Sequence, residues 1–196
     1  MSRRIVLATH NEHKARELGE ILTPLLGDVD VVTAGSLGLP DPVETGVTFA
    51  QNALLKARAA QAATGLDAIA DDSGIAVDVM GGAPGILSAR WSGTHGADRE
   101  NLELLLAQMA DIPDEHRGAS FVCAAAFVGA DGSEIVEQGL MPGRLAHEAH
   151  GAGGFGYDPI FLVGQGQRTA AELSPEEKNE VSHRGAAFRA LAAHLA

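Results

Sequence analysis

The stretch AIADDSGIAVDVMGGAPG, residues 68–85, constrains this chain more than any other. An apolar run predicts a buried strand, but two adjacent acids, Asp71 and Asp72, follow at once, and Ser73 and Gly74 come next. A carboxylate at the end of a buried strand costs free energy unless a cation lies opposite it. The fold must therefore bring positive charge to this strand, from basic side chains or from a bound metal ion.

Hydrophobic patterns along the chain alternate between strands and helices. Within residues 68–85 we expect two strands joined by a tight turn at the acids. A capping box of Thr48 and Gln51 is expected to start the second helix, and Gly65 to end it. The other expected strands cover residues 4–8, 29–32, 120–128, 134–140 and 157–163, and the expected helices begin near Asn11, Thr48, Asp98, Ser174 and Ser182. This order predicts an α/β protein with a mixed sheet, in which ligands bind at strand ends and helix N-termini.

The length of 196 residues suits one domain, or two lobes that share a core. Cys123 is the only cysteine and lies in an apolar run, so we expect a buried thiol and no intramolecular disulfide. No apolar run reaches about 18 residues, and the first residues lack a signal-peptide pattern. We therefore expect a cytoplasmic protein that does not associate with a membrane.

The formal net charge of −12 limits the class of partner. A nucleic acid polymer is not expected, because proteins bind such polymers by neutralising phosphates with Lys and Arg. A small anionic ligand remains possible where positive charge is local. The chain has three lysines among its 14 basic residues, Lys14, Lys56 and Lys178, and each lies in a motif of interest.

Two segments in the first third of the chain suit phosphate binding. In ATHNEHK, residues 8–14, a strand ends and a helix begins, so that Thr9, backbone N–H groups and Lys14 would point at one place. An ordinary turn capped by an Asn is the alternative. In ETGVTFAQNALLKA, residues 44–57, Asn52 and Lys56 are four apart and share a helix face. Lys56 could bind phosphate, or it could extend along the helix to solvent.

The acids suit a divalent cation. Asp71 and Asp72 would point to opposite faces if their strand continues. One could hold the turn through backbone N–H groups while the other binds Mg²⁺, which prefers one or two carboxylates together with substrate phosphates. Both could instead be turn or cap residues. Glu44, in a loop before Gly46, could reach the metal or be solvated, and Arg90 could bind phosphate or form a structural ion pair.

The last third of the chain carries groups suited to a purine base. In GAGGFGYDPIF, residues 151–161, glycines allow close backbone approach, and Phe155 or Tyr157 could stack on a base or fill the core. In ELSPEEKNEVSHRG, residues 172–185, the cationic side chains can donate to a purine oxygen or a phosphate, or can be a solvated helix end. Taken together, the motifs describe a nucleoside triphosphate held with Mg²⁺.

Five segments carry a resemblance to a known family: ADDSGIAVDVMGGAPGILSARWSG, GGFGYDPIF and AELSPEEKNEVSHRG, with THNEHK and ETGVTFAQNALLKA in support. Over nearly its whole length the chain resembles the inosine/xanthosine triphosphate pyrophosphatases, which hydrolyse deaminated purine nucleoside triphosphates. The resemblance implies a homodimer of an elongated α/β fold, one domain over residues 1–196 with a long mixed sheet and two lobes flanking the active site. It also implies Mg²⁺-dependent cleavage of ITP, dITP and XTP between the α- and β-phosphates, giving a monophosphate and pyrophosphate.

The resemblance also assigns site residues. Asp72 resembles the family's catalytic and Mg²⁺-binding aspartate, and Glu44 is the second expected metal ligand, with Val43 where some members carry a further acid. His10 stands where many members have Gly or Ser. The expected substrate-binding residues are Thr9, His10, Asn11, Glu12, His13, Lys14, Lys56, Ser73, Arg90, Phe155, Gly156, Tyr157, Asp158, Lys178, His183 and Arg184.

Two other classes of function compete with this one. A metal-dependent phosphatase could use Asp71 or Asp72 as a nucleophile and form an aspartyl-phosphate, but it would release orthophosphate rather than pyrophosphate. A nucleotide-binding sensor would bind without turnover and would not need acids at the metal position. Incubation with ITP and Mg²⁺, followed by product analysis, separates the three.

Overall fold

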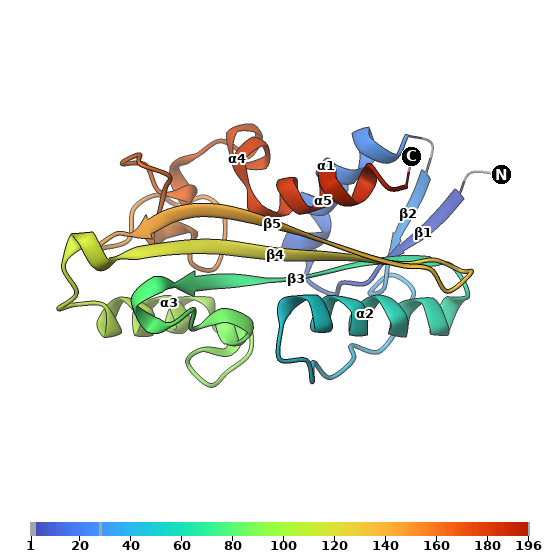
Figure 1. The fold of residues 1–196 in the computed structure, drawn as a ribbon, viewed down its shortest axis with the longest axis horizontal. Helices are drawn as coiled ribbons and strands as arrows, with labels where there is room; N and C mark the ends of the chain where they lie inside the picture. Colours follow the sequence, from blue (N-terminus) through green and yellow to red (C-terminus); the bar gives the residue numbers. More distant parts are fainter. Residues whose placement is uncertain (1–2, 28, 196) are drawn as a thin grey trace. The chain divides into compact units, whose positions relative to one another are not determined.

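The computed structural model describes residues 3–27 and 29–195 (Figure 1). The strands are β1 (Arg3–Leu7), β2 (Val29–Thr33), β3 (Asp67–Val77), β4 (Gly118–Val128), β5 (Glu134–Leu145) and β6 (Phe161–Val163), and the α-helices are α1 (Glu12–Leu26), α2 (Phe49–Thr64), α3 (Asp98–Gln108), α4 (Pro175–Val181) and α5 (His183–Ala192). Among these residues, no helix has both the length and the apolar character needed to cross a bilayer.

The six strands form one sheet in the order β2-β1-β3-β4-β5-β6. β1 pairs in parallel with both β2 and β3, whereas β5 and β6 pair antiparallel. The predicted α/β class with a mixed sheet is therefore confirmed. β1 ends at Leu7, which pairs with Ile69, so the loop that follows β1 starts beside the first part of β3, two residues before Asp71.

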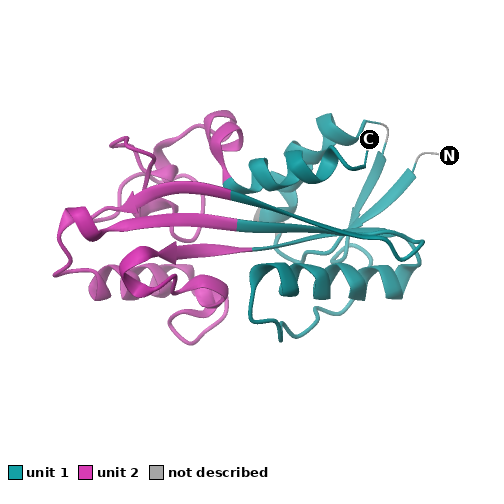
Figure 2. Cartoon of the chain, viewed as in Figure 1, with its two compact units in different colours: residues 1–72, 123–139, 183–196 teal, residues 73–122, 140–182 magenta. Residues whose placement is uncertain are grey.

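The chain divides into two compact units, coloured separately in Figure 2. Unit 1 comprises residues 1–72, 123–139 and 183–196, and unit 2 comprises residues 73–122 and 140–182. β3, β4 and β5 each contribute residues to both units. Each unit has its own hydrophobic cluster.

Unit 1 has a core on both faces of its strands. On one face, Ile5, Leu7 and Ile69 pack with Leu18 of α1 and Phe188 of α5. The opposite face is covered by α2 and is lined by small residues: Ala53, Ala57, Ala60, Ala68, Ala70, Ala124 and Ala126. This alternation of buried side chains along β3 sends successive residues to different helices. The buried thiol of Cys123 lies on the α1 and α5 face, as expected, and burial raises its pKa.

Unit 2 is built around α3 and the ends of three strands. Its cluster includes Ile75 of β3, Leu105 of α3 and Phe121 of β4, whose ring centroid lies 4.4 Å from that of Phe161. The guanidinium of Arg117, which is 1% exposed, donates to backbone carbonyls including those of Met109, Leu145 and Ala146. These bonds satisfy N–H groups of the buried guanidinium with carbonyl oxygens, and they connect the start of β4 to the segments around it.

The structure corrects the prediction of two strands around a turn within residues 68–85. β3 runs without interruption from Asp67 to Val77, straight through the two acids. Gly74 is needed for a close approach rather than for a turn, because a Cβ there would collide with the Ser88 Oγ and the Gly85 carbonyl oxygen. The alternative in which both acids are turn or cap residues is therefore wrong.

Two other local predictions also need correction. The strand expected over residues 157–163 begins only at Phe161, because Asp158–Ile160 form a 3₁₀ turn that contains Pro159. Thr48 caps α2 as predicted, but the Gln51 side chain accepts from the Val47 N–H rather than from Thr48, so the capping box is incomplete. The expected stop at Gly65, with its left-handed backbone, is confirmed.

Candidate active site

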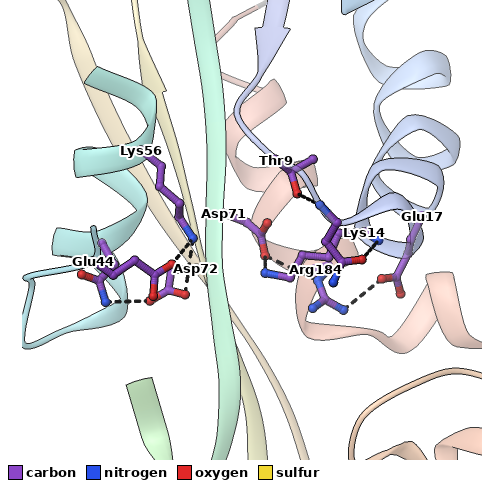
Figure 3. Close-up of polar contacts among 10 residues, drawn as sticks. Thr9, Lys14, Glu17, Glu44, Lys56, Asp71, Asp72 and Arg184 are labelled. Atoms are coloured by element: carbon purple, nitrogen blue, oxygen red, sulfur yellow. Dashed lines mark hydrogen bonds and ion pairs between the residues drawn. The ribbon is translucent and has the colours of Figure 1, made fainter. Parts of the chain in front are cut away.

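The two adjacent acids of β3 lie on opposite faces of the strand (Figure 3). Asp71 faces α1 and α5, and Asp72 faces α2. Both are buried, with 2% and 6% of their surface exposed. Because the strand continues, the two acids contact different basic side chains, and these supply the positive charge that buried carboxylates require.

On the α2 face, one lysine contacts two carboxylates. The Lys56 Nζ donates to Glu44 Oε1 at 2.9 Å and lies 3.5 Å from Asp72 Oδ1. One helical turn earlier, the Asn52 amide donates to Asp72 Oδ2 at 3.1 Å. α2 presents Asn52 and Lys56 on one face, as their spacing predicts, and directs both at the end of the unit 1 part of β3.

Burial and charge act against each other in this group. Burial raises the pKa of Asp72 above its ordinary value, and the Lys56 ammonium only partly offsets this. Burial would lower the pKa of Lys56, but Asp72, Asp71 and Glu44 together raise it, so the ammonium is retained at neutral pH. Asp72, Glu44 and Lys56 therefore carry a net negative charge when both acids are ionised.

The geometry of these acids suits a divalent cation. Glu44 and Asp72 both lie within ion-pair distance of a single cationic atom, the Lys56 Nζ, so their oxygens converge. Over residues 3–27 and 29–195, no group of three or more His, Cys, Asp or Glu side chains has a metal-binding arrangement. Two carboxylates match the way Mg²⁺ is commonly held, by one or two protein carboxylates with substrate phosphates and water completing its shell.

On the opposite face of β3, Asp71 is surrounded by basic groups. The Lys14 Nζ donates to Asp71 Oδ2 at 3.1 Å, and the Arg184 Nε lies 3.5 Å from the same oxygen. Arg184 also donates to Glu17 Oε2 at 2.9 Å. Although burial alone would raise the pKa of Asp71, Lys14, Arg184 and Lys56 together hold it well below its ordinary value. At neutral pH Asp71 is thus an anion that connects β3 to Lys14 of α1 and Arg184 of α5.

The start of α5 is brought close to the sheet by a glycine. A Cβ built on Gly139 of β5 would collide with the His183 carbonyl oxygen and the Ala187 nitrogen. The first turn of α5 therefore packs directly on β5. His183 and Arg184 are both buried in that turn, at 3% and 5% exposure.

The loop between β1 and α1 has the asparagine cap that the sequence predicts. Asn11 caps α1, its Oδ1 accepting from the Lys14 N–H at 3.0 Å, and Thr9 Oγ1 accepts from the Asn11 N–H at 3.2 Å. His10 Nε2 lies 2.7 Å from the Leu39 carbonyl oxygen. Glu12 and His13 lie in the first turn of α1, but their side chains are outside the described residues. Phosphate binding and an ordinary capped turn both fit this arrangement.

Unit 2 contains a second buried ion pair. Asp158 Oδ2 accepts from the Lys178 Nζ at 2.7 Å and from the Phe155 N–H at 2.8 Å. The Lys178 Nζ also lies 5.1 Å from the centroid of the Phe155 ring. Asp158 therefore fixes the lysine and the aromatic ring relative to one another, and Gly154 allows this because a Cβ there would collide with the Asp158 carboxylate.

Four further predicted site residues are Tyr157, Gly156, Ser73 and Arg90. The Tyr157 ring is buried in the unit 2 core and its hydroxyl donates to the Ser88 carbonyl at 2.8 Å, so it is unsuited to stacking on a base. The Gly156 N–H donates to Asp98. Ser73 follows Asp72 in β3 and Arg90 ends a 3₁₀ turn, and both are half-buried.

A sequence model of the Ham1 family matches residues 5–194. The chain belongs to the Ham1 family. The dITP/XTP pyrophosphatase of Streptomyces coelicolor is 59% identical over 189 residues, which cover 96% of this chain and 94% of that protein. The nucleoside-triphosphatase / dITP/XTP pyrophosphatase from Mycobacterium abscessus is similar in structure, with a TM-score of 0.79, 51% identity and 98% of both chains covered.

A HAM1 protein from Coxiella burnetii has a TM-score of 0.88 at 40% identity, again over 98% of both chains. These matches confirm the family and the fold class predicted from the sequence.

In this Ham1-family chain, the residue patterns did not reveal two polar contacts. Glu17, which binds Arg184, was not among the predicted site residues. Its spacing of three from Lys14 on α1 was the available signal, since residues at i and i+3 share a helix face. Asn52 was placed on the face of Lys56, but its bond to Asp72 depends on tertiary packing.

Proposed function

We propose that this chain hydrolyses ITP, dITP and XTP to the monophosphate and pyrophosphate, with Mg²⁺ as cofactor. The observation that carries the proposal is the convergence of Asp72 and Glu44 on the Lys56 ammonium, beside a helix that also orients Asp72. The names of its relatives, dITP/XTP pyrophosphatase, support this substrate class.

Asp72 and Glu44 are the residues proposed to hold Mg²⁺. The ion, when bound, neutralises phosphate charge and lowers the pKa of water in its shell. Asp72 orients the attacking water or accepts its proton, a role for which a carboxylate with a raised pKa is suited. Lys56 and Lys14 offer further positive charge to the triphosphate and to the departing pyrophosphate.

The base is proposed to be recognised by donors and by one aromatic ring. Inosine and xanthosine carry an oxygen at purine position 6, where adenine carries an amine. The family resemblance assigns Lys178, His183 and Arg184 to the base, and when charged these side chains can donate to that oxygen but cannot accept from the amine. Phe155 offers a stacking face for any purine, and Asp158 orients Lys178 beside it.

The test compares kcat/KM for ITP, XTP, ATP and GTP with Mg²⁺ and identifies the products. We expect pyrophosphate, and a preference for ITP over ATP of roughly 10⁴-fold, because unpaired buried donors penalise the wrong base edge. The Arg184→Ala change should narrow the ITP-to-ATP ratio, whereas Phe155→Ala should weaken all purines alike. Orthophosphate as the product would favour an aspartyl-phosphate mechanism, and binding of ITP without turnover would favour a sensor.

The homodimer is what the family resemblance implies, whereas the cytoplasm and the class of partner follow from the composition and charge of the chain. We propose that the enzyme acts in the cytoplasm on the free nucleotide pool, as a homodimer. Neither a nucleic acid polymer nor a membrane is proposed as a partner.

A further inference from the structure

The segment that carries Glu44 has little apolar packing to hold it. Residues 41–46 belong to no helix or strand, and the side chains of Val43 and Val47, on either side of Glu44, are 79% and 77% exposed. A cavity of about 90 Å³ is lined by residues 39–42, at the start of this segment, and by Lys56 and alanines of α2. The position of Glu44 therefore depends on polar contacts more than on burial of apolar side chains.

Asn52 supplies one of these contacts and connects it to β3. Its Oδ1 accepts from the Gly46 N–H at 2.8 Å, and its Nδ2 donates to Asp72 Oδ2 at 3.1 Å. The partners set the orientation of the amide, because a backbone N–H needs an acceptor and a carboxylate needs a donor. Asn52 is fully buried, so both bonds are shielded from water.

We propose that Asn52 is a positioning residue that holds the Glu44 segment and the Asp72 carboxylate in one arrangement, and thereby preforms the divalent-cation site. The inference rests on the proposed function, in which Glu44 and Asp72 hold Mg²⁺. Asn52 touches neither substrate nor metal in this role. It acts through a single planar amide that joins the two acid-bearing parts of unit 1.

The chemistry of position 52 is narrow. Aspartate could accept from Gly46 but would repel Asp72, and leucine has a similar size but makes neither bond. The fit also depends on Gly46, because a Cβ built there would lie 2.5 Å from Asn52 Oδ1 and 2.7 Å from Gln51 Cβ. A side chain at position 46 would therefore push the Glu44 segment away from the amide.

The experiment measures Mn²⁺ binding to the nucleotide-free protein by electron paramagnetic resonance, in wild type, Asn52→Leu and Gly46→Ala. Outer residues that orient metal ligands commonly contribute about 10–100-fold in metal affinity, so both variants should bind Mn²⁺ at least about tenfold more weakly. Gln51→Ala is the matched control. It removes a bond to the Val47 N–H at 2.8 Å in the same segment without touching Asp72, and its Mn²⁺ affinity should stay within about twofold of wild type.

Thermal unfolding of each variant checks that it folds. If Asn52→Leu does not fold, Gly46→Ala, which changes a half-buried loop, still tests the inference. The inference is overturned if the folded Asn52→Leu and Gly46→Ala variants bind Mn²⁺ as tightly as wild type. It is also overturned if Gln51→Ala loses as much Mn²⁺ affinity as they do. Wild type that binds Mn²⁺ no better than Asp72→Asn also overturns it. The proposed function is judged separately, by whether wild type releases pyrophosphate from ITP.

Discussion

Asp71 and Asp72 are neighbours in one strand, and their surroundings differ in kind. Asp71 meets Lys14 and Arg184, and these cations hold its pKa well below the ordinary value despite its burial. Asp72 meets one lysine, which Glu44 shares, and burial leaves its pKa raised. The difference arises from the strand itself, because side-chain alternation sends the two acids to different helices.

The comparison separates a carboxylate that stabilises the fold from one that costs folding free energy. A carboxylate with a lowered pKa contributes stability at neutral pH, whereas one with a raised pKa is disfavoured there when ionised. An acid kept in unfavourable surroundings is a common mark of a functional group. By this criterion Asp72 is the better candidate for chemistry, and Asp71 is the better candidate for a structural role.

The largest expected effect is that of Asp72→Asn on turnover. Loss of the carboxylate should lower kcat for ITP by about 10²–10⁴-fold, because a proton acceptor and a metal ligand are lost together. The folded pKa of Asp72 is raised, so its ionised form reduces stability as pH rises above about 4. The variant should therefore unfold at pH 7 at a temperature no lower than wild type. Near-normal kcat in the folded variant would remove Asp72 from the proposed mechanism.

Asp71→Asn should act on stability first. Leaving Lys14 and Arg184 without their shared anion should cost about 3–5 kcal/mol in the free energy of unfolding at pH 7, the range for breaking a buried ion pair. The folded pKa is lowered, so this contribution is complete above about pH 5 and is lost as pH falls below about 4. Urea unfolding of both proteins from pH 7 to pH 3 should show their difference shrinking with acid. A constant difference would show that Asp71 is not held as an anion by these pairs.

The smallest expected effects are those of the lysines on substrate affinity. Lys56→Ala should lower kcat/KM for ITP about tenfold, which is the scale of one hydrogen bond to a charged group. Inhibition by IMP should weaken less, because IMP lacks the β- and γ-phosphates. Lys14→Ala should show the same preference for the triphosphate and in addition lower the unfolding temperature, because Lys14 also binds Asp71. Equal losses for ITP and IMP would place these lysines away from the β- and γ-phosphates.

Much of unit 1 follows from local patterns in the sequence. The caps of α1 and α2 and the shared face of Asn52 and Lys56 depend on residues within one helical turn, and all are present in the structure. The opposite directions of Asp71 and Asp72 follow from strand alternation once the strand continues.

What the sequence could not resolve depends on contacts between distant segments. Gly74 suits a turn equally well, and only the approach of residues 85–88 shows that it is needed for close packing. The pair of Lys14 with Asp71 joins residues 57 positions apart, and the pair of Glu17 with Arg184 joins residues 167 apart. No local pattern specifies such pairs, and they decide which acid is structural.

The place of α5 in unit 1 has a consequence for synthesis of the protein. Phe188 and Leu191 are fully buried against β1 and α1, but the ribosome makes them only after every residue of unit 2. The apolar surface of β1 and α1 that α5 covers can therefore be buried only after translation of unit 2 is complete. Unit 1 cannot follow the common course in which N-terminal domains fold while the chain is still growing.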